Sequence, residues 1–412
     1  MARNLRICIL VDNHFRGGVA SVTSVLLNRH FGEDIELILV TNHNNPMPVD
    51  VNVGEKELNK VIYFKFVSSS KWFAGTAQWS VFTGVGILLD AFRKFLKPFL
   101  LLHQVIYFTR LFKTENFDAL LNVNGGYPGS ITSRAAALGW SRGGSSGRQV
   151  MAIHNYAAPS RIGFRLIDRC IDRAVVSRVD EVVTVSNSCK LSFANRPSLG
   201  SHQKITVIPN GVETLQRKDH LREETRKALN LVNNQTVVLM LGTYEPRKGH
   251  EFLLQSFAEL QNLYPSARLI CAGDDPNQVI KHLQKRVGQL GLVGLVTLMP
   301  FQSDISRLME ACDIVAIPSQ SYESFCLVAV EAFKYAKPIV GTNVGAIPEI
   351  APQGLGAILC GPENSIEFSQ ALYRLSTDQK MYAEYCELSG LRFAKFGVAE
   401  MVLSYKKCLL GT

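Results

Sequence analysis

The feature that most constrains the fold is a double alternation of short apolar runs with amphipathic stretches. Buried parallel strands appear in a sequence as short apolar runs. In the first half of the chain such runs lie at residues 5–11, 35–41, 60–67, 117–123, 149–154, 180–186 and 204–209. In the second half they lie at residues 236–243, 267–273, 295–300, 313–318, 338–342 and 356–360. Amphipathic helical stretches separate most of the runs, so we expect two doubly wound α/β domains with parallel sheets.

Pro and Asn-Gly interrupt the pattern at residues 208–213, where we place the domain boundary. The expected domains are residues 1–212 and residues 213–390, both Rossmann-like. The last segment, residues 391–412, is expected to be a helix that packs back onto the first domain. Ligands of open α/β sheets bind beyond the carboxyl ends of the strands. Two such domains are therefore expected to face a central cleft.

Composition excludes several classes of protein. Hydrophobic residues make up 47% of the 412 residues and charged residues 19%, as in a folded α/β protein rather than a disordered one. The nine cysteines are scattered and form no CxxC pair. This pattern argues against a disulfide framework or a zinc site and favours a reducing, cytoplasmic compartment. The N-terminal residues show no secretory signal pattern.

The formal net charge of +9 comes from the first half of the chain, because residues 1–212 carry 24 Lys and Arg against 14 Asp and Glu. Residues 59–113 hold eight basic residues and one acidic residue, interleaved with aromatic and aliphatic side chains. We favour peripheral contact with an anionic membrane over nucleic acid. A buried helix with a solvated basic face is the alternative. The uncharged stretch 72–89 is rich in Gly, Thr, Ser and Gln, and we reject it as a membrane-spanning helix.

Two loops that follow apolar runs contain residues suited to bind an anion. In VDNHFRGGVASV, residues 11–22, Gly17 and Gly18 lie between a strand and a helix, where the backbone could approach a phosphate or simply make a tight turn. In LGTYEPRKGHEF, Arg247 and Lys248 lie between a strand and a helix. They are either solvated or placed to neutralise a diphosphate without a metal ion.

A third loop carries two glutamates eight positions apart. In SYESFCLVAVEAF, residues 321–333, Glu323 lies in the loop and Glu331 within the following helix. Backbone N–H groups at the start of that helix, from residues 325 to 327, are expected to be free for a phosphate. Glu251 and Glu259 have the same spacing but lie within one helix, so we expect them to face solvent.

These loops resemble those of the retaining glycosyltransferases of family 4, which have the GT-B fold. In the second half the resemblance rests on LGTYEPRKGHEFLLQSF and DIVAIPSQSYESFCLVAVEAFKYAKPIVGTNVGAIPEI, in the family's order and spacing. In the first half GGV (17–19), AIHN (152–155), VTVSNSCK (183–190) and VIPNGV (207–212) correspond more loosely. Two positions depart from the family pattern. Cys326 stands where Gly is common, and Asn155-Tyr156 follow His154 where an acidic residue is common.

The resemblance implies specific residue roles. The implied catalytic residues are Glu323, His154, Arg247 and Lys248. The implied donor-binding residues are Gly17, Gly18, Arg247, Lys248, Phe325, Cys326, Leu327 and Glu331. On this pattern Glu323 touches the transferred sugar, Glu331 holds the ribose, and the base lies near residues 299–301. A structural role for His154 is the alternative.

The resemblance also implies the reaction, which is transfer of a sugar from a UDP- or GDP-type nucleotide-sugar to a carbohydrate or lipid-linked acceptor. The anomeric configuration is retained, and the leaving phosphate helps to deprotonate the acceptor. No cofactor, metal ion or nucleic acid is expected. Together with the basic first domain, this favours bacterial cell-surface polysaccharide biosynthesis at the inner face of the cytoplasmic membrane. The alternatives are a non-catalytic sugar-nucleotide-binding membrane scaffold, and a nucleotide-sugar epimerase or hydrolase.

Overall fold

A computed structural model shows two compact units, each of which is described by itself. Unit 1 comprises Met1–Gly211 and Val398–Thr412, and unit 2 comprises Val212–Gly397. The structure describes residues 4–12, 18–28, 31–32, 34–43, 60–66, 84–144, 147–160, 165–214 and 220–412, with the backbone alone for residues 84–95.

A parallel sheet forms the centre of unit 1. It has seven strands in the order β3-β2-β1-β4-β5-β6-β7. The strands are β1 (Leu5–Val11), β2 (Ile35–Asn42), β3 (Lys60–Phe64), β4 (Ala119–Asn124), β5 (Arg148–Ile153), β6 (Glu181–Thr184) and β7 (Ile205–Val207). Each lies at one of the seven apolar runs of the first half, which confirms the expected doubly wound α/β architecture.

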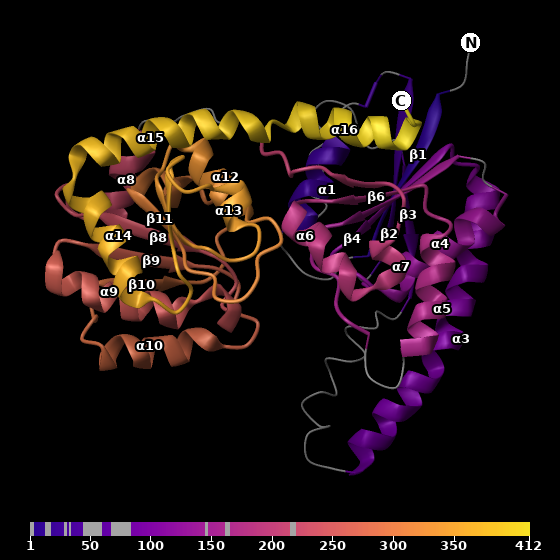
Figure 1. Ribbon diagram of the computed structural model, residues 1–412, viewed down its shortest axis with the longest axis horizontal. Helices are drawn as coiled ribbons and strands as arrows, with labels where there is room; N and C mark the ends of the chain where they lie inside the picture. Colours follow the sequence, from indigo (N-terminus) through magenta and orange to yellow (C-terminus); the bar gives the residue numbers. More distant parts are fainter. Residues whose placement is uncertain are drawn as a thin grey trace. The chain divides into compact units, whose positions relative to one another are not determined.

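Helices connect these strands and cover the sheet (Figure 1). They are α1 (Gly18–Asn28), α3 (Gly84–Glu115), α4 (Ile131–Arg142), α5 (Arg165–Val176), α6 (Asn187–Leu191) and α7 (Pro197–Gly200), with the 3-10 turn η1 (Ser192–Asn195). The last helix of the chain, α16 (Val398–Leu410), also belongs to this unit.

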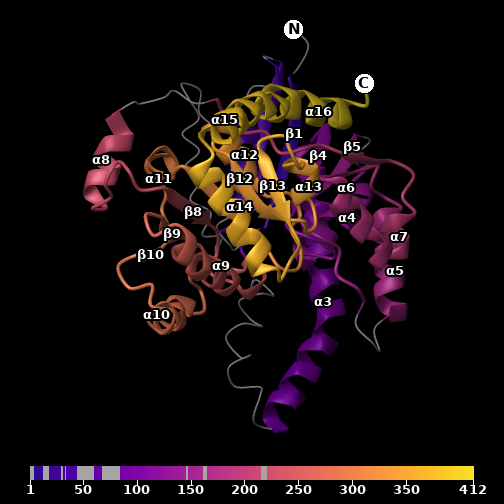
Figure 2. The same ribbon diagram turned by 60° about the vertical axis from the view of Figure 1, so that its left-hand side comes forward.

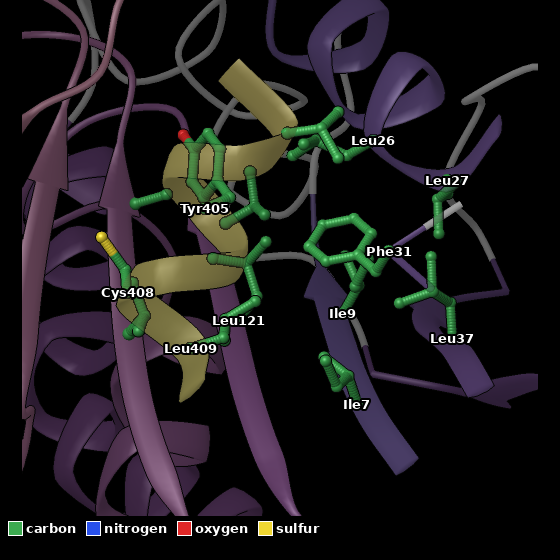
Figure 3. Close-up of a cluster of buried hydrophobic side chains, with 14 of the residues drawn as sticks. Ile7, Ile9, Leu26, Leu27, Phe31, Leu37, Leu121, Tyr405, Cys408 and Leu409 are labelled. Atoms are coloured by element: carbon green, nitrogen blue, oxygen red, sulfur yellow. The ribbon is translucent and has the colours of Figure 1, made fainter. Parts of the chain in front are cut away.

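The hydrophobic core of unit 1 includes α16. Tyr405 and Leu409 are buried in the same cluster as Ile9 of β1 and Leu121 of β4, as Figure 3 shows. Arg148 at the start of β5 fixes the helix further, because its Nε donates to the carbonyl of Cys408 at 2.8 Å. Residues almost 400 positions apart along the chain therefore share one core.

Helix α3 extends well past the sheet of unit 1 in both views (Figures 1 and 2). Phe108 and Phe112 on its inner face are buried, and the ring of Phe112 lies 5.2 Å from that of Trp140 on α4. Gly139 of α4 permits this close packing, because a Cβ there would lie 2.8 Å from the Cβ of Phe108. The expectation of a buried helix with a solvated face therefore fits the inner side of α3.

Unit 2 contains a second parallel sheet, whose six strands have the order β10-β9-β8-β11-β12-β13. The strands are β8 (Val237–Leu241), β9 (Arg268–Ala272), β10 (Val296–Met299), β11 (Ile314–Ile317), β12 (Ile339–Thr342) and β13 (Ala357–Cys360). They match the six predicted runs. The order reverses between β8 and β11, so the loops that follow these two strands lie at a topological switch point.

The helices of unit 2 follow the same alternation. They are α8 (His220–Ala228), α9 (His250–Leu263), α10 (Val279–Gln289), α11 (Ser306–Ala311), α12 (Leu327–Lys334), α13 (Ile347–Ile350), α14 (Ser365–Thr377) and α15 (Gln379–Phe393). The 3-10 turns are η2 (Pro246–Lys248) and η3 (Ala394–Phe396). Phe257 of α9 and Phe368 of α14 lie in the core that these helices form with the sheet.

The expected helix over residues 391–412 is not continuous. Helix α15 ends at Phe393, η3 follows, and Gly397 has the extended conformation φ −69°, ψ 135° before α16 begins. The hydrogen bond from Val212 N to Phe396 O, 3.0 Å long, ties this break to the start of unit 2. In the ranges that the structure describes, no helix is long and apolar enough to cross a membrane. Residues 72–83 of the rejected span lie outside those ranges.

Candidate functional site

A tight turn after β8 holds the predicted cation pair. Pro246 begins the 3-10 turn η2, and Gly249 closes it with the left-handed conformation φ 81°, ψ 31°. Any side chain at Gly249 would overlap the carbonyl oxygen of Pro318, at the end of β11. The amide of Gln320 also donates to the carbonyl of Arg247 at 2.8 Å. The loop after β8 is therefore fastened to the loop after β11.

Glu323, in the loop after β11, contacts both cations of the loop after β8. Its Oε2 lies 2.5 Å from Lys248 Nζ and 3.6 Å from Arg247 Nη1. The hydroxyl of Ser319 donates to the same oxygen at 3.2 Å. Glu323 is only 6% exposed, so its charge depends on these partners. Arg247, Lys248 and Glu323, three of the residues implied by the resemblance, thus form one ionic cluster in which Glu323 is buried and the two cations are partly exposed.

The helix that follows Glu323 begins as the sequence indicated. Cys326 precedes the first residue of α12, Leu327, and has the unusual conformation φ 70°, ψ 69°. Within the described chain, the N–H groups of Phe325 and Cys326 donate to no backbone carbonyl. Burial raises the pKa of the Cys326 thiol to about 12, helped by the charge of Glu323, so the side chain is neutral. N–H groups at the start of a helix, with cations nearby, have the polarity that suits an anion.

Glu331 lies on α12, as the sequence indicated, one turn into the helix. Burial raises the pKa of its carboxyl group above the ordinary value, and Lys334, 3.6 Å away, opposes that shift. The comparison pair differs. Glu251 is exposed and contacts His282 at 2.6 Å, as expected, but Glu259 is half-buried and accepts from the hydroxyl of Ser365. The expectation that Glu259 faces solvent was wrong, because α14 packs beside it.

The predicted site residues of the first domain, His154, Gly17 and Gly18, belong to unit 1. His154 follows β5 and is buried, and both ring nitrogens lack a hydrogen-bond partner within the described residues. Burial lowers the pKa of His154 to about 4, although the amide of Asn210 opposes this shift, so the imidazole is neutral at pH 7. Gly18 is the first residue of α1, and Gly17 lies outside the described residues.

Sequence reasoning missed several residues around the cation pair. Glu245 accepts from Arg247 Nε at 2.7 Å, and the ring of Tyr322 lies 5.1 Å from Arg247 Cζ. His250 is buried against Tyr244, with ring centroids 4.5 Å apart, and burial together with Lys248 lowers its pKa to about 4. The EPRKGH stretch contains two of the missed residues, Glu245 and His250, but spacing alone does not show which side chains meet.

Tyr244 also contacts Met299, the last residue of β10. The hydroxyl of Tyr244 donates to the carbonyls of Cys271 and Met299, each at 2.9 Å, which fixes the backbone where the nucleotide base was expected. No group of three or more His, Cys, Asp or Glu residues in the described ranges could hold a metal ion.

Comparison with known protein families gives a match within unit 2. Residues 221–387 match the model of the family "Glycosyl transferases group 1". This segment contains the whole ionic cluster and the helix α12. The match covers most of unit 2 and none of unit 1.

Two curated relatives match over part of their length. One is a D-inositol 3-phosphate glycosyltransferase of Segniliparus rotundus, 32% identical over 161 residues, 38% of this chain and 36% of the relative. The other is a lipopolysaccharide 1,2-N-acetylglucosaminetransferase of Salmonella typhimurium, 26% identical over 200 residues, 47% of this chain and 52% of the relative. The chain therefore spans about half or less of the relatives that it matches.

The fold extends over the whole chain. The crystal structure of Anabaena HepE in complex with UDP superimposes with a TM-score of 0.74, covering 99% of this chain and 100% of HepE. At 19% identity this likeness shows the fold alone, which is of the GT-B type. The predicted fold is confirmed, and the family model that matches residues 221–387 is that of the predicted family.

Proposed function

We propose that this protein is a retaining glycosyltransferase that moves a hexose from a UDP- or GDP-type nucleotide-sugar to a carbohydrate or lipid-linked acceptor. The observation that carries the proposal is the convergence of Arg247 and Lys248 on Glu323, beside the start of α12. Two cations and the free N–H groups of Phe325 and Cys326 suit a diphosphate, whose developing charge they would stabilise as the sugar departs. The relatives named above, and UDP in the HepE crystal, support this reading.

The two glutamates have different roles in this proposal. Glu323 contacts the cations, so it lies where the diphosphate meets the sugar and can accept hydrogen bonds from sugar hydroxyls. Glu331, further along α12, holds the ribose hydroxyls. The bond between the anomeric carbon and the diphosphate oxygen breaks, and its electron pair stays on that oxygen. The acceptor oxygen forms a new bond to the same face of the anomeric carbon, and the diphosphate oxygen takes the proton of the acceptor hydroxyl. Such a reaction keeps the anomeric configuration and uses no metal ion.

The first unit is proposed to bind the acceptor and the membrane surface. The outer face of α3 exposes Phe99, Leu102 and Ile106, and further along the same face Arg110 and Lys113. This pattern of apolar groups beside cations is typical of helices that lie on anionic lipid. It favours a lipid-linked acceptor and a place in bacterial cell-surface polysaccharide biosynthesis, at the inner face of the cytoplasmic membrane.

The test of the reaction begins with nucleotide binding. Purified protein is screened by thermal shift against UDP, GDP, ADP and CDP, because a ligand that binds the native state raises the melting temperature. The nucleotide-sugars of the best binder are then incubated with and without acceptors. Transfer that Glu323→Gln abolishes supports the proposal. Binding without turnover would favour the scaffold alternative, and sugar inversion or release without an acceptor would favour the epimerase or hydrolase.

The membrane contact has its own test. Sedimentation with vesicles of phosphatidylcholine containing 30% phosphatidylglycerol is expected at low salt and is expected to weaken as salt rises. Replacing Arg110 and Lys113 with Gln should lower the bound fraction, whereas the same change at Lys281 and Lys285, exposed on α10, should not. An unaltered protein that stays in the supernatant at low salt would contradict the membrane contact.

A further inference from the structure

Two neighbours fix the guanidinium of Arg247. Its Nε donates to Oε2 of Glu245 at 2.7 Å, in a charge-assisted hydrogen bond. The ring of Tyr322 lies 5.1 Å from Cζ, within the range of a cation–π contact. Glu245 lies directly before η2 and Tyr322 directly before Glu323, so both loops of the cluster take part.

The contact with Glu245 decides which part of the guanidinium remains available. A guanidinium can bind an anion with two parallel hydrogen bonds, either from its side edge, Nε and one Nη, or from its end edge, Nη1 and Nη2. Glu245 occupies Nε. Within the described part of the chain, Nη1 and Nη2 form no hydrogen bond, and Oε2 of Glu323 lies 3.6 Å from Nη1 as an ion pair. Of the two edges, only the end edge therefore has both nitrogens without a hydrogen bond to these residues.

Glu245 has two opposing effects on an anion in this position. Its negative charge repels the anion and weakens binding. Its carboxylate oxygen also fixes the orientation of the guanidinium. This favours bidentate hydrogen bonding of Arg247 to the anion, because the side chain loses less conformational freedom on binding. By charge alone, an acidic residue beside an anion-binding arginine weakens binding of the anion. Orientation of the guanidinium is the favourable effect that Glu245 contributes in this geometry.

We propose that Glu245 is a positioning residue which, with Tyr322, presents the end edge of Arg247 to the diphosphate of the nucleotide. This inference rests on the proposed function, because it takes the anion to be a nucleoside diphosphate. It adds a binding geometry and assigns a role to two residues, Glu245 and Tyr322, to which the family resemblance gave none. Glu245 acts through Arg247 and does not touch the nucleotide.

The experiment separates the two effects of Glu245 by using two variants of equal charge. Glu245→Gln and Glu245→Ala both remove the negative charge, but only Gln keeps an oxygen that can accept from Arg247 Nε. The dissociation constants of UDP and of inorganic pyrophosphate are measured by calorimetry on the full chain. We expect Glu245→Gln to bind as tightly as the unaltered protein or tighter, and Glu245→Ala to bind about fivefold more weakly than Glu245→Gln.

An Arg247→Lys background shows whether the effect passes through the arginine. Lysine has no Nε–H edge to orient, so the difference between Gln and Ala at position 245 should disappear there. Tyr322→Phe should keep the affinity for UDP, and Tyr322→Leu should lose about threefold, because only Phe retains the ring face. Ala and Gln at the exposed Glu251 should not differ from each other.

The outcomes separate this inference from the proposed function. Equal dissociation constants for Glu245→Gln and Glu245→Ala would overturn the positioning role. So would a difference that persists with Lys at position 247, since the role would then be structural. If the unaltered protein binds none of the nucleoside diphosphates and no pyrophosphate, the proposed function fails first.

Discussion

The contact between Lys248 and Glu323 offers a quantitative test of the ionic cluster. The two side chains are 17% and 8% exposed, and their charged atoms lie 2.5 Å apart. At an effective dielectric constant of roughly 20, the attraction at this distance is about 7 kcal/mol. Desolvation of the two charges costs several kcal/mol for each ion and offsets most of it. We therefore expect a net coupling free energy of about 2 kcal/mol.

The coupling is measured with the variants Lys248→Met, Glu323→Gln and the double variant. Lys248→Met should lower the free energy of unfolding of unit 2 by about 2 kcal/mol, less than for a fully buried pair, because Arg247 and Ser319 still contact the carboxylate. The double variant should lose less than the sum of the two single variants. The non-additive difference is the coupling.

The readout must report on unit 2. The tryptophans stand at positions 72, 79 and 140, all before unit 2, so their fluorescence reports on the other unit. Hydrogen–deuterium exchange of peptides from β8 and β11, measured in the exchange regime that reports opening free energies, gives the required value. A coupling below about 0.5 kcal/mol, the scatter of independent sites, would refute the reasoning that the buried pair organises the cluster.

Three further outcomes follow from the same geometry. Gly249→Ala places a Cβ against the Pro318 carbonyl at φ 81° and should lower the free energy of unfolding of unit 2 by more than about 2 kcal/mol in the exchange assay. The control Gly354→Ala, at φ 78° but in open space, should cost only about 1 kcal/mol, and equal losses would contradict the overlap. Buried His154 and His250 have pKa values of about 4, against 6.5 in the unfolded chain, so each binds fewer protons in the folded state than in the unfolded state. The free energy of unfolding should therefore fall as the pH drops from about 6.5 toward 4, by about 1.4 kcal/mol per histidine at pH 5.5. His250→Phe should flatten this pH dependence for unit 2, and an unchanged slope would argue against the buried neutral imidazole. Glu331→Ala should weaken binding of UDP about tenfold in calorimetry and leave binding of pyrophosphate unchanged, because only UDP loses two hydrogen bonds from its ribose. Glu259→Ala is the control, and an equal loss of affinity for both ligands would place Glu331 at the phosphates.

The site residues could be predicted from the sequence only where the local pattern carries the information. Arg247, Lys248 and Glu323 lie in the loops that follow buried strands, and in a parallel sheet the carboxyl ends of neighbouring strands lie at one edge. Their role came from the motif. Glu245 and Tyr322 have no distinctive spacing, and only the fold shows that both contact the same guanidinium.

What the sequence determined by itself is the succession of strands, because a strand buried on both faces needs a short apolar run whatever surrounds it. All thirteen predicted runs carry a strand of the described structure. Tertiary structure decided the contacts between distant segments. It brought Lys248 and Glu323, 75 residues apart, within 2.5 Å. It also placed α16 in the core of unit 1, and it turned Glu259 toward α14. These outcomes depend on which faces of the elements pack together, and that depends on the whole chain.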